Sequence, residues 1–99
     1  MKEVVKQSCS YEVPASIEMY QEVKRLIGDE PANGMLAHLV MRSESGLRHL
    51  EVWDSEAACH QFRQQRVAPA VHTVLKAAGF TEMPEEPVLE ELDLVDFEV

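Results

Sequence analysis

Residues 36–53 contain His38, Arg42, His49, Glu51 and the only tryptophan of the chain, Trp53. An imidazole ring titrates at about pH 6.5, so it can accept or donate a proton near neutral pH. A carboxylate beside such a ring orients it and raises its pKa. We therefore select His38 and Glu51 as candidate catalytic residues for general acid–base chemistry, provided that the fold brings them together.

A predicted hairpin brings these two side chains together. Residues 35–42 and 47–54 have strand character and are joined by the turn residues 43–46. A connection centred on Glu44 and Ser45 places His38 opposite Glu51, and cross-strand partners share one face of a sheet. One face carries Ala37, Leu39, Met41, Leu50 and Val52, and the other carries Leu36, His38, Val40, Arg42, Leu47, His49, Glu51 and Trp53.

The apolar face of this hairpin is expected to pack under helices, and the mixed face is expected to stay uncovered. A patch of this kind usually marks a partner surface. Two interpretations remain open. His38 and Glu51 form a structural pair inside a dimer interface, with the pKa of His38 raised by the carboxylate, or the face lines a ligand pocket. In the second case the candidate substrate-binding residues are Leu36, Arg42, His49 and Trp53.

Two predicted helices and two further strands position this hairpin. A strand over residues 2–13 ends at Pro14, and a helix with apolar residues at helical spacing follows and closes at Gly28. A second helix begins after a cap at Asp54 or Ser55 and ends at Gly79, with a kink or break near residues 66–68 caused by Pro69. A last strand is expected over residues 88–99, with a bulge near Leu94.

The predicted element order is β-α-β-β-α-β. Right-handed crossovers turn this order into a ferredoxin-like α+β sandwich, in which two helices cover one face of a four-stranded antiparallel sheet. Residues 1–99 are expected to form one such domain, since the length suits a single core and no linker divides the chain. The sheet face without helices needs a cover, and a second copy of the chain would supply one.

Composition narrows the possible partners. The chain has 18 acidic and 9 basic residues and a formal charge of −9, so we expect no nucleic acid partner. No apolar run of membrane-spanning length occurs, so no membrane partner is expected. Cys9 and Cys59 are too few for a disulfide framework and lack zinc-site spacing. We therefore expect a cytoplasmic protein without a metal site.

The stretch from Glu51 to Ala58, EVWDSEAA, runs from a strand into an acidic helix start. Together with the element order, it resembles the dimeric α+β-barrel superfamily, and within it the antibiotic-biosynthesis-monooxygenase-like group. The resemblance implies a homodimer with a pocket for a small molecule between each sheet and its helices. It also implies cofactor-independent monooxygenase chemistry on small aromatic or quinol-like substrates. The alternative is a non-catalytic dimeric ligand-binding or interaction protein of the same fold.

The second helix supplies two further candidate substrate-binding residues, Phe62 and His72. Haem-degrading members of the superfamily carry a paired Trp and His on this helix and an Asn on the first strand. His72 matches that His, whereas Phe62 stands where the Trp would be and the first strand has no Asn. No haem or other cofactor is therefore expected. Phe62 is assigned to the apolar wall of the pocket, and His72 to its polar lining.

Overall fold

The computed structural model describes residues 7–95 and has the predicted order of helices and strands. The first half comprises β1 (Gln7–Val13), α1 (Ile17–Ile27), β2 (Met35–Ser43) and β3 (Gly46–Trp53). The second half comprises α2 (Glu56–Phe62), the π-helical turn η1 (Arg63–Val67), α3 (Ala68–Ala77) and β4 (Glu90–Leu92). The helical run α2–η1–α3 corresponds to the single second helix predicted from the sequence.

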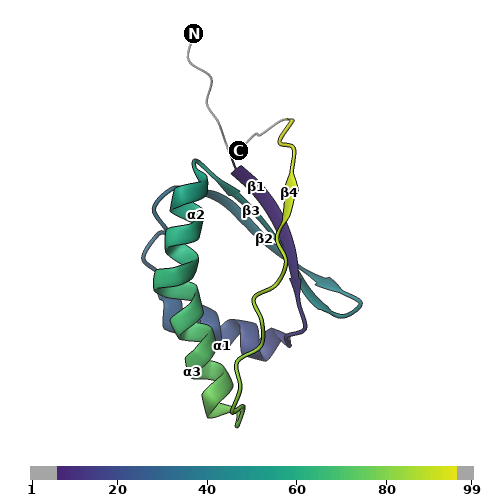
Figure 1. Cartoon of the computed structure of the whole chain (residues 1–99), viewed down its shortest axis with the longest axis vertical. Coiled ribbons are helices and arrows are strands. Elements are labelled where there is room, and N and C mark those ends of the chain that lie inside the picture. Colours follow the sequence, from purple (N-terminus) through teal and green to yellow (C-terminus); the bar gives the residue numbers. More distant parts are fainter. Residues whose placement is uncertain (1–6, 96–99) are drawn as a thin grey trace.

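The four strands form one antiparallel sheet in the order β2-β3-β1-β4. Figure 1 shows α1 and the α2–η1–α3 run on the same side of this sheet. The arrangement confirms the predicted α+β sandwich, in which a four-stranded antiparallel sheet is covered by helices on one face. Within residues 7–95, no helix is both long and apolar enough to cross a membrane.

The predicted hairpin register is confirmed, with one local irregularity. His38 lies opposite Glu51, and Val40 lies opposite His49. The register shifts between Met35 and Ala37, so that Trp53 pairs with Met35 and Leu36 is the extra residue of a bulge. On its other edge β3 pairs with β1, which places Cys9 beside Glu51. Cys9, Glu51 and His38 thus form one row across three strands.

The assignment of the two sheet faces to helices and to solvent was wrong. The face that carries His38, His49 and Glu51 points toward the helices, since His49 contacts Tyr20 of α1 and Glu51 lies 3.9 Å from Arg63 of η1. The opposite face carries Leu39 and Met41, whose exposed fractions are 49% and 45%. Alternation in a strand fixes which residues share a face but not which face receives the helices.

α1 and α2 each begin after a serine whose side chain accepts a hydrogen bond from a free backbone N–H. The Oγ of Ser16 accepts from the N–H of Met19, and the Oγ of Ser55 accepts from the N–H of Ala58, each over 3.1 Å. Ser55, and not Asp54, is therefore the cap of the second helical run. Gly28 ends α1 with a φ of 87°, as predicted for a C-terminal glycine.

Pro69 does not break the second helical run. A proline at this position has no N–H to donate to the preceding turn, so regular α-helical bonding cannot continue through it. The chain adapts by widening into the π-helical turn η1, in which the N–H of Ala68 bonds to the carbonyl of Arg63, five residues earlier. The irregularity predicted near residues 66–68 is thus a continuous π-helical turn over Arg63–Val67, and no break is present.

Within the described residues, the last strand is shorter than predicted. The last strand, expected over residues 88–99, is observed only at Glu90–Leu92, where it pairs with β1. The bulge expected near Leu94 is not present, because the strand has ended before that residue. Residues 96–99 lie outside the described residues, as do residues 2–6 of the predicted first strand.

The hairpin turn depends on Gly46, which has a φ of 153°. A Cβ atom at this position would lie 2.1 Å from the carbonyl oxygen of Val13 and 2.8 Å from the Cα of Pro14. Both neighbours are backbone atoms, which cannot move away independently of the sheet. Gly46 therefore lets the hairpin turn lie against the end of β1.

We predict that Gly46→Ala lowers the free energy of unfolding by about 2–4 kcal/mol, because the clash must displace backbone. Gly28→Ala is the matched control, since its φ is also positive but no atom lies within 4 Å of the added Cβ. Gly28→Ala should lower the free energy of unfolding by only about 1 kcal/mol. Urea denaturation of both variants measures the difference, and equal losses would contradict the packing argument.

Candidate functional site

The carboxylate of Glu51 is buried between the sheet and the helices, with 4% of its side-chain surface exposed. The Tyr11 hydroxyl donates to Oε2 over 2.6 Å, and the Trp53 indole N–H donates to Oε1 over 2.9 Å. A buried carboxylate without such partners would cost several kcal/mol or take up a proton. Two neighbouring strands therefore supply the donors that stabilise Glu51 in the interior.

Arg63 brings a positive charge to the same carboxylate from the helical layer. Its Nη1 lies 3.9 Å from Oε2 of Glu51, and its guanidinium carbon lies 4.3 Å from the centre of the Tyr11 ring. Nη1 is buried and makes no hydrogen bond within the described residues. Arg63 thus interacts with Glu51 through charge and with Tyr11 through the face of the ring.

Two histidines extend this cluster toward the outer edge strand β2. Nε2 of His38 lies 3.0 Å from Nδ1 of His49 and 3.9 Å from Oε2 of Glu51. The His49 ring stacks on Tyr11 with centroids 4.6 Å apart. His49 is buried, whereas 27% of the His38 side chain is exposed. His38 is therefore the point at which the buried acid–base cluster meets solvent.

Both imidazoles have lowered pKa values. Burial lowers the pKa of His49 to about 4, and charge repulsion from His38 adds to this effect. Burial also lowers the pKa of His38, and this outweighs the opposing attraction to Glu51. The raised pKa predicted for His38 was therefore wrong, because the carboxylate and the ring are buried together. Both rings are neutral near pH 7 and are available as proton acceptors.

The structure brings together some of the predicted site residues and leaves others apart. His38, His49, Glu51 and Trp53 form the cluster, and Phe62 packs on Trp53 with ring centroids 5.5 Å apart. Trp53 is 0% exposed, so it supports Glu51 and does not line an open pocket. Leu36 lies in the bulge of β2, Arg42 is exposed at the hairpin end opposite Leu47, and His72 is exposed on α3.

Four residues of the cluster were not selected from the sequence: Cys9, Tyr11, Cys59 and Arg63. The alternation of β1 places Cys9 and Tyr11 on one face, but no local pattern predicts the register between β1 and β3. Cys59 and Arg63 are four residues apart on one helical run, which places them on the same face. That spacing was an available signal, although it does not show which strands the face covers.

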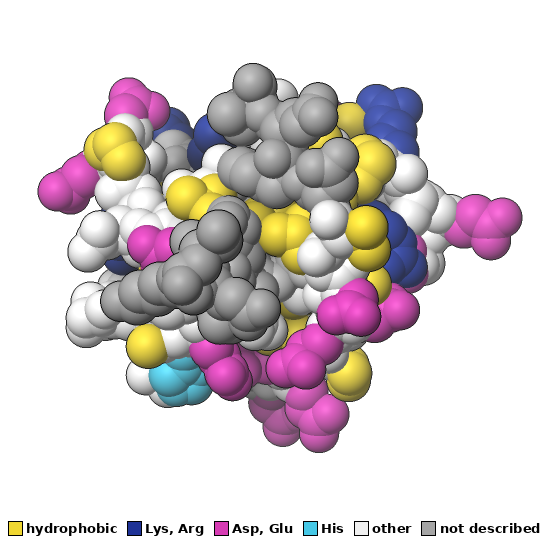
Figure 2. Space-filling model, turned by 90° about the horizontal axis from the view of Figure 1, so that it is seen from above, with side chains coloured by type: hydrophobic (Ala, Val, Ile, Leu, Met, Phe, Trp, Pro, Cys, Tyr) yellow, Lys and Arg dark blue, Asp and Glu magenta, His cyan; other side chains and the backbone are white. Residues whose placement is uncertain are grey.

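A pocket of about 280 Å³ opens beside the cluster, on the side away from β2. Its lining includes Gln7 and Cys9 of β1, Cys59 and four other side chains of the second helical run, and three residues of β4 and the segment that leads into it. The lining residues are Gln7, Cys9, Glu56, Cys59, His60, Arg63, Gln64, Glu86, Leu89 and Glu91. In the view of Figure 2, acidic side chains gather along one edge of the molecule beside exposed hydrophobic side chains.

We predict that stability falls as the pH is lowered from about 6.5 toward 4, by up to about 1.4 kcal/mol per pH unit for His49 alone. The folded pKa of His49 lies below the unfolded value, so its contribution is fully present above about pH 6.5 and is lost on acidification. His49→Gln should flatten this slope, whereas His72→Gln, at an exposed position, should not. Urea denaturation at several pH values tests this, and parallel slopes for wild type and His49→Gln would contradict it.

No family model matches the sequence, and no curated protein matches it. The α+β arrangement is therefore established by the structure itself, whereas membership of the dimeric α+β-barrel superfamily is a proposal. The activity of this chain has to be inferred from its own residues.

Proposed function

We propose that this protein is a small-molecule-binding homodimer of the dimeric α+β-barrel type, which oxidises small aromatic or quinol-like substrates with oxygen and without a cofactor. The observation that carries the proposal is the position of His38. Its ring is partly exposed, contacts His49 and lies 3.9 Å from the buried carboxylate of Glu51. The imidazole of His38, a proton acceptor at the surface, therefore lies beside the negative charge of the buried Glu51 carboxylate.

In this proposal His38 is the catalytic base. When its Nε2–H donates to Nδ1 of His49, its Nδ1 carries a lone pair that can accept a phenolic proton. The imidazolium that forms is stabilised by the charge of Glu51, which Tyr11 and Trp53 hold in place. Lys24 of α1 lies close enough to lower the pKa of His38 by repulsion, and its positive charge would also stabilise a substrate anion.

The electron-rich anion then reacts with oxygen. In the oxidation of a quinol, two electrons and the remaining proton leave the substrate, and O₂ becomes H₂O₂ while the quinol becomes a quinone. In a monooxygenation, a CH₂ group beside an aromatic ring becomes a carbonyl, and the second oxygen atom leaves as water. Both reactions balance with O₂ as the only co-reactant, so the protein has to supply only binding, orientation and a base.

We predict that the protein consumes oxygen when supplied with one or more members of a panel of quinols and polyphenols, and that His38→Gln slows this by about 100-fold or more. Glu51→Gln should also slow it, because the imidazolium loses its counter-charge. Glu18→Gln is the matched control, since Glu18 is exposed on α1. An oxygen electrode measures the rates, and circular dichroism checks that each variant is folded.

Two outcomes would contradict the catalytic proposal. Oxygen uptake that is the same in wild type and His38→Gln would remove His38 as the base. Binding of a quinol without any oxygen uptake would instead support the alternative, a non-catalytic dimeric ligand-binding protein. The complete burial of Trp53 favours that alternative, because the indole stabilises Glu51 and leaves no open aromatic wall beside it.

The homodimer forms, in this proposal, through the sheet face that carries Leu39 and Met41. Both side chains are close to half exposed, and the helices lie on the other face of the sheet. Burial of apolar area is worth about 25 cal/mol per Å², and obligate interfaces often bury more than about 2,000 Å². The two thiols, which are free and buried, suit a reducing compartment, so we propose a cytoplasmic location.

We predict that the protein sediments at about twice the 11.2 kDa of one chain, and that Leu39→Lys shifts it to the monomer by placing a charge in the interface. Leu26→Lys is the matched control, because Leu26 is 40% exposed but lies on α1. Sedimentation at micromolar concentration distinguishes these states. A wild-type monomer would contradict the dimer, and equal dissociation by both variants would contradict the choice of face.

A further inference from the structure

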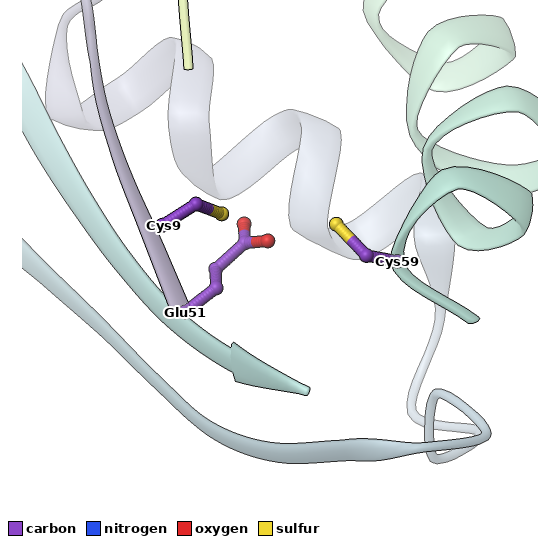
Figure 3. Close-up of side chains that lie close together, drawn as sticks. All are labelled: Cys9, Glu51 and Cys59. Carbon is purple, nitrogen blue, oxygen red and sulfur yellow. The ribbon is translucent and has the colours of Figure 1, made fainter. Parts of the chain in front are cut away.

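The chain holds a second chemically reactive group of side chains, on the side of Glu51 that faces away from His38. Cys9 of β1 and Cys59 of α2 both point toward the carboxylate of Glu51 (Figure 3). Their sulfur atoms and a carboxylate oxygen of Glu51 all lie within 4.8 Å of one another. The two thiols are 50 residues apart in the sequence, so only the packing of α2 on the sheet brings them together.

We propose that Cys9, Cys59 and Glu51 form a binding site for a thiophilic divalent cation such as Zn²⁺. Thiolate sulfur and carboxylate oxygen are both zinc ligands, at about 2.3 Å and 2.0–2.2 Å from the metal. Two sulfur ligands of a tetrahedral zinc lie about 3.8 Å apart, so the cluster would have to contract by no more than about 1 Å. Side-chain rotation of the two cysteines is sufficient for such a movement.

Glu51 retains the capacity to bind a cation while it is held by its present partners. Its Oε2 accepts from Tyr11 and faces Arg63, whereas its Oε1 accepts one hydrogen bond, from Trp53. A carboxylate oxygen has two lone pairs, so Oε1 has one that remains for a metal. The cation would thus join a carboxylate that the fold already orients, as the ligands of stable metal sites are oriented by neighbouring hydrogen bonds.

The charges of the site balance when a divalent cation is bound. Two thiolates neutralise the cation, and Arg63, which lies 3.9 Å from Glu51, neutralises the carboxylate. Without this balance, the insertion of a double positive charge beside a buried guanidinium would be strongly unfavourable. The presence of two cysteines, and not one, is therefore what allows a cation to enter this part of the interior.

The pocket of about 280 Å³ gives the cation a route to the thiols, because Cys9 and Cys59 form part of its wall. Glu56, Glu86 and Glu91 line the same pocket and favour a cation over an anion. Three protein ligands beside an open pocket are the arrangement of zinc sites that keep one coordination position for water or another small molecule. Simple packing of two buried cysteines explains neither the carboxylate between them nor the acidic entrance.

The test is a titration of the reduced protein with Zn²⁺ in competition with a chromophoric chelator, after both thiols have been counted. We expect one equivalent to bind, with release of about two protons from the thiols. Cys59→Ser should weaken Zn²⁺ binding by more than about 100-fold. Loss of a residue that only hydrogen-bonds to a metal ligand already lowers metal affinity by about 10–100-fold, and loss of a ligand should lower it further. Glu18→Gln is the matched control, because Glu18 is exposed on α1 and lies outside both the pocket and the ligand cluster, and it should change the affinity less than about threefold.

A second measurement needs no variant. Co²⁺ bound by two thiolates in a tetrahedral site gives sulfur-to-metal charge-transfer absorption in the near ultraviolet and intense visible bands. Failure of the reduced wild type to bind either metal at micromolar concentration would overturn the proposal. Unchanged affinity in a folded Cys59→Ser variant would do the same. No step of the titration measures oxygen uptake, so its result is independent of the proposed activity.

Discussion

The burial of Glu51 is the constraint on which the rest of this structure depends. A carboxylate in the interior is tolerated only where donors and positive charge surround it. Here β1 supplies the Tyr11 hydroxyl, β3 supplies the Trp53 indole and the helical layer supplies Arg63. Three elements that are separate in the sequence are thereby required to meet at one point. The side chains around Glu51 are consequently held in fixed positions, which is the property that either a catalytic base or a metal ligand needs.

The position of Arg63 follows from the proline six residues later. Pro69 prevents regular α-helical bonding through residues 63–67, and the widened turn η1 keeps the helical run continuous. Arg63 begins this turn and lies over Tyr11, while Arg66 of the same turn donates to the carbonyls of Ile27 and Glu30 at the end of α1. The π-helical turn therefore connects both helices to the cluster. Such turns occur frequently at functional sites, and this one carries the only arginine that faces Glu51 within the described residues.

The two faces of the hairpin point in the opposite directions to those that their polarity suggested. The histidines and Glu51 lie under the helices, where their polar atoms satisfy one another, and the more apolar face with Leu39 and Met41 is open. In the proposed dimer, a second copy of the chain would cover this leucine and methionine. The proposed active site and the proposed dimer interface are then on opposite faces of one sheet. A change in one can be made without removing the other.

Local patterns in the sequence determined the element order, the hairpin register and the glycine that ends α1. Each of these depends on neighbouring residues, such as the alternation that sets His38 opposite Glu51. Only the tertiary structure decided which face of the sheet the helices cover, because both faces contain large apolar side chains. The same packing decided that Cys9 and Cys59 meet at Glu51, and that burial lowers the pKa of His38 more than the carboxylate raises it. The sequence contains the residues of the cluster, but desolvation and long-range proximity arise only when the helices pack on the sheet.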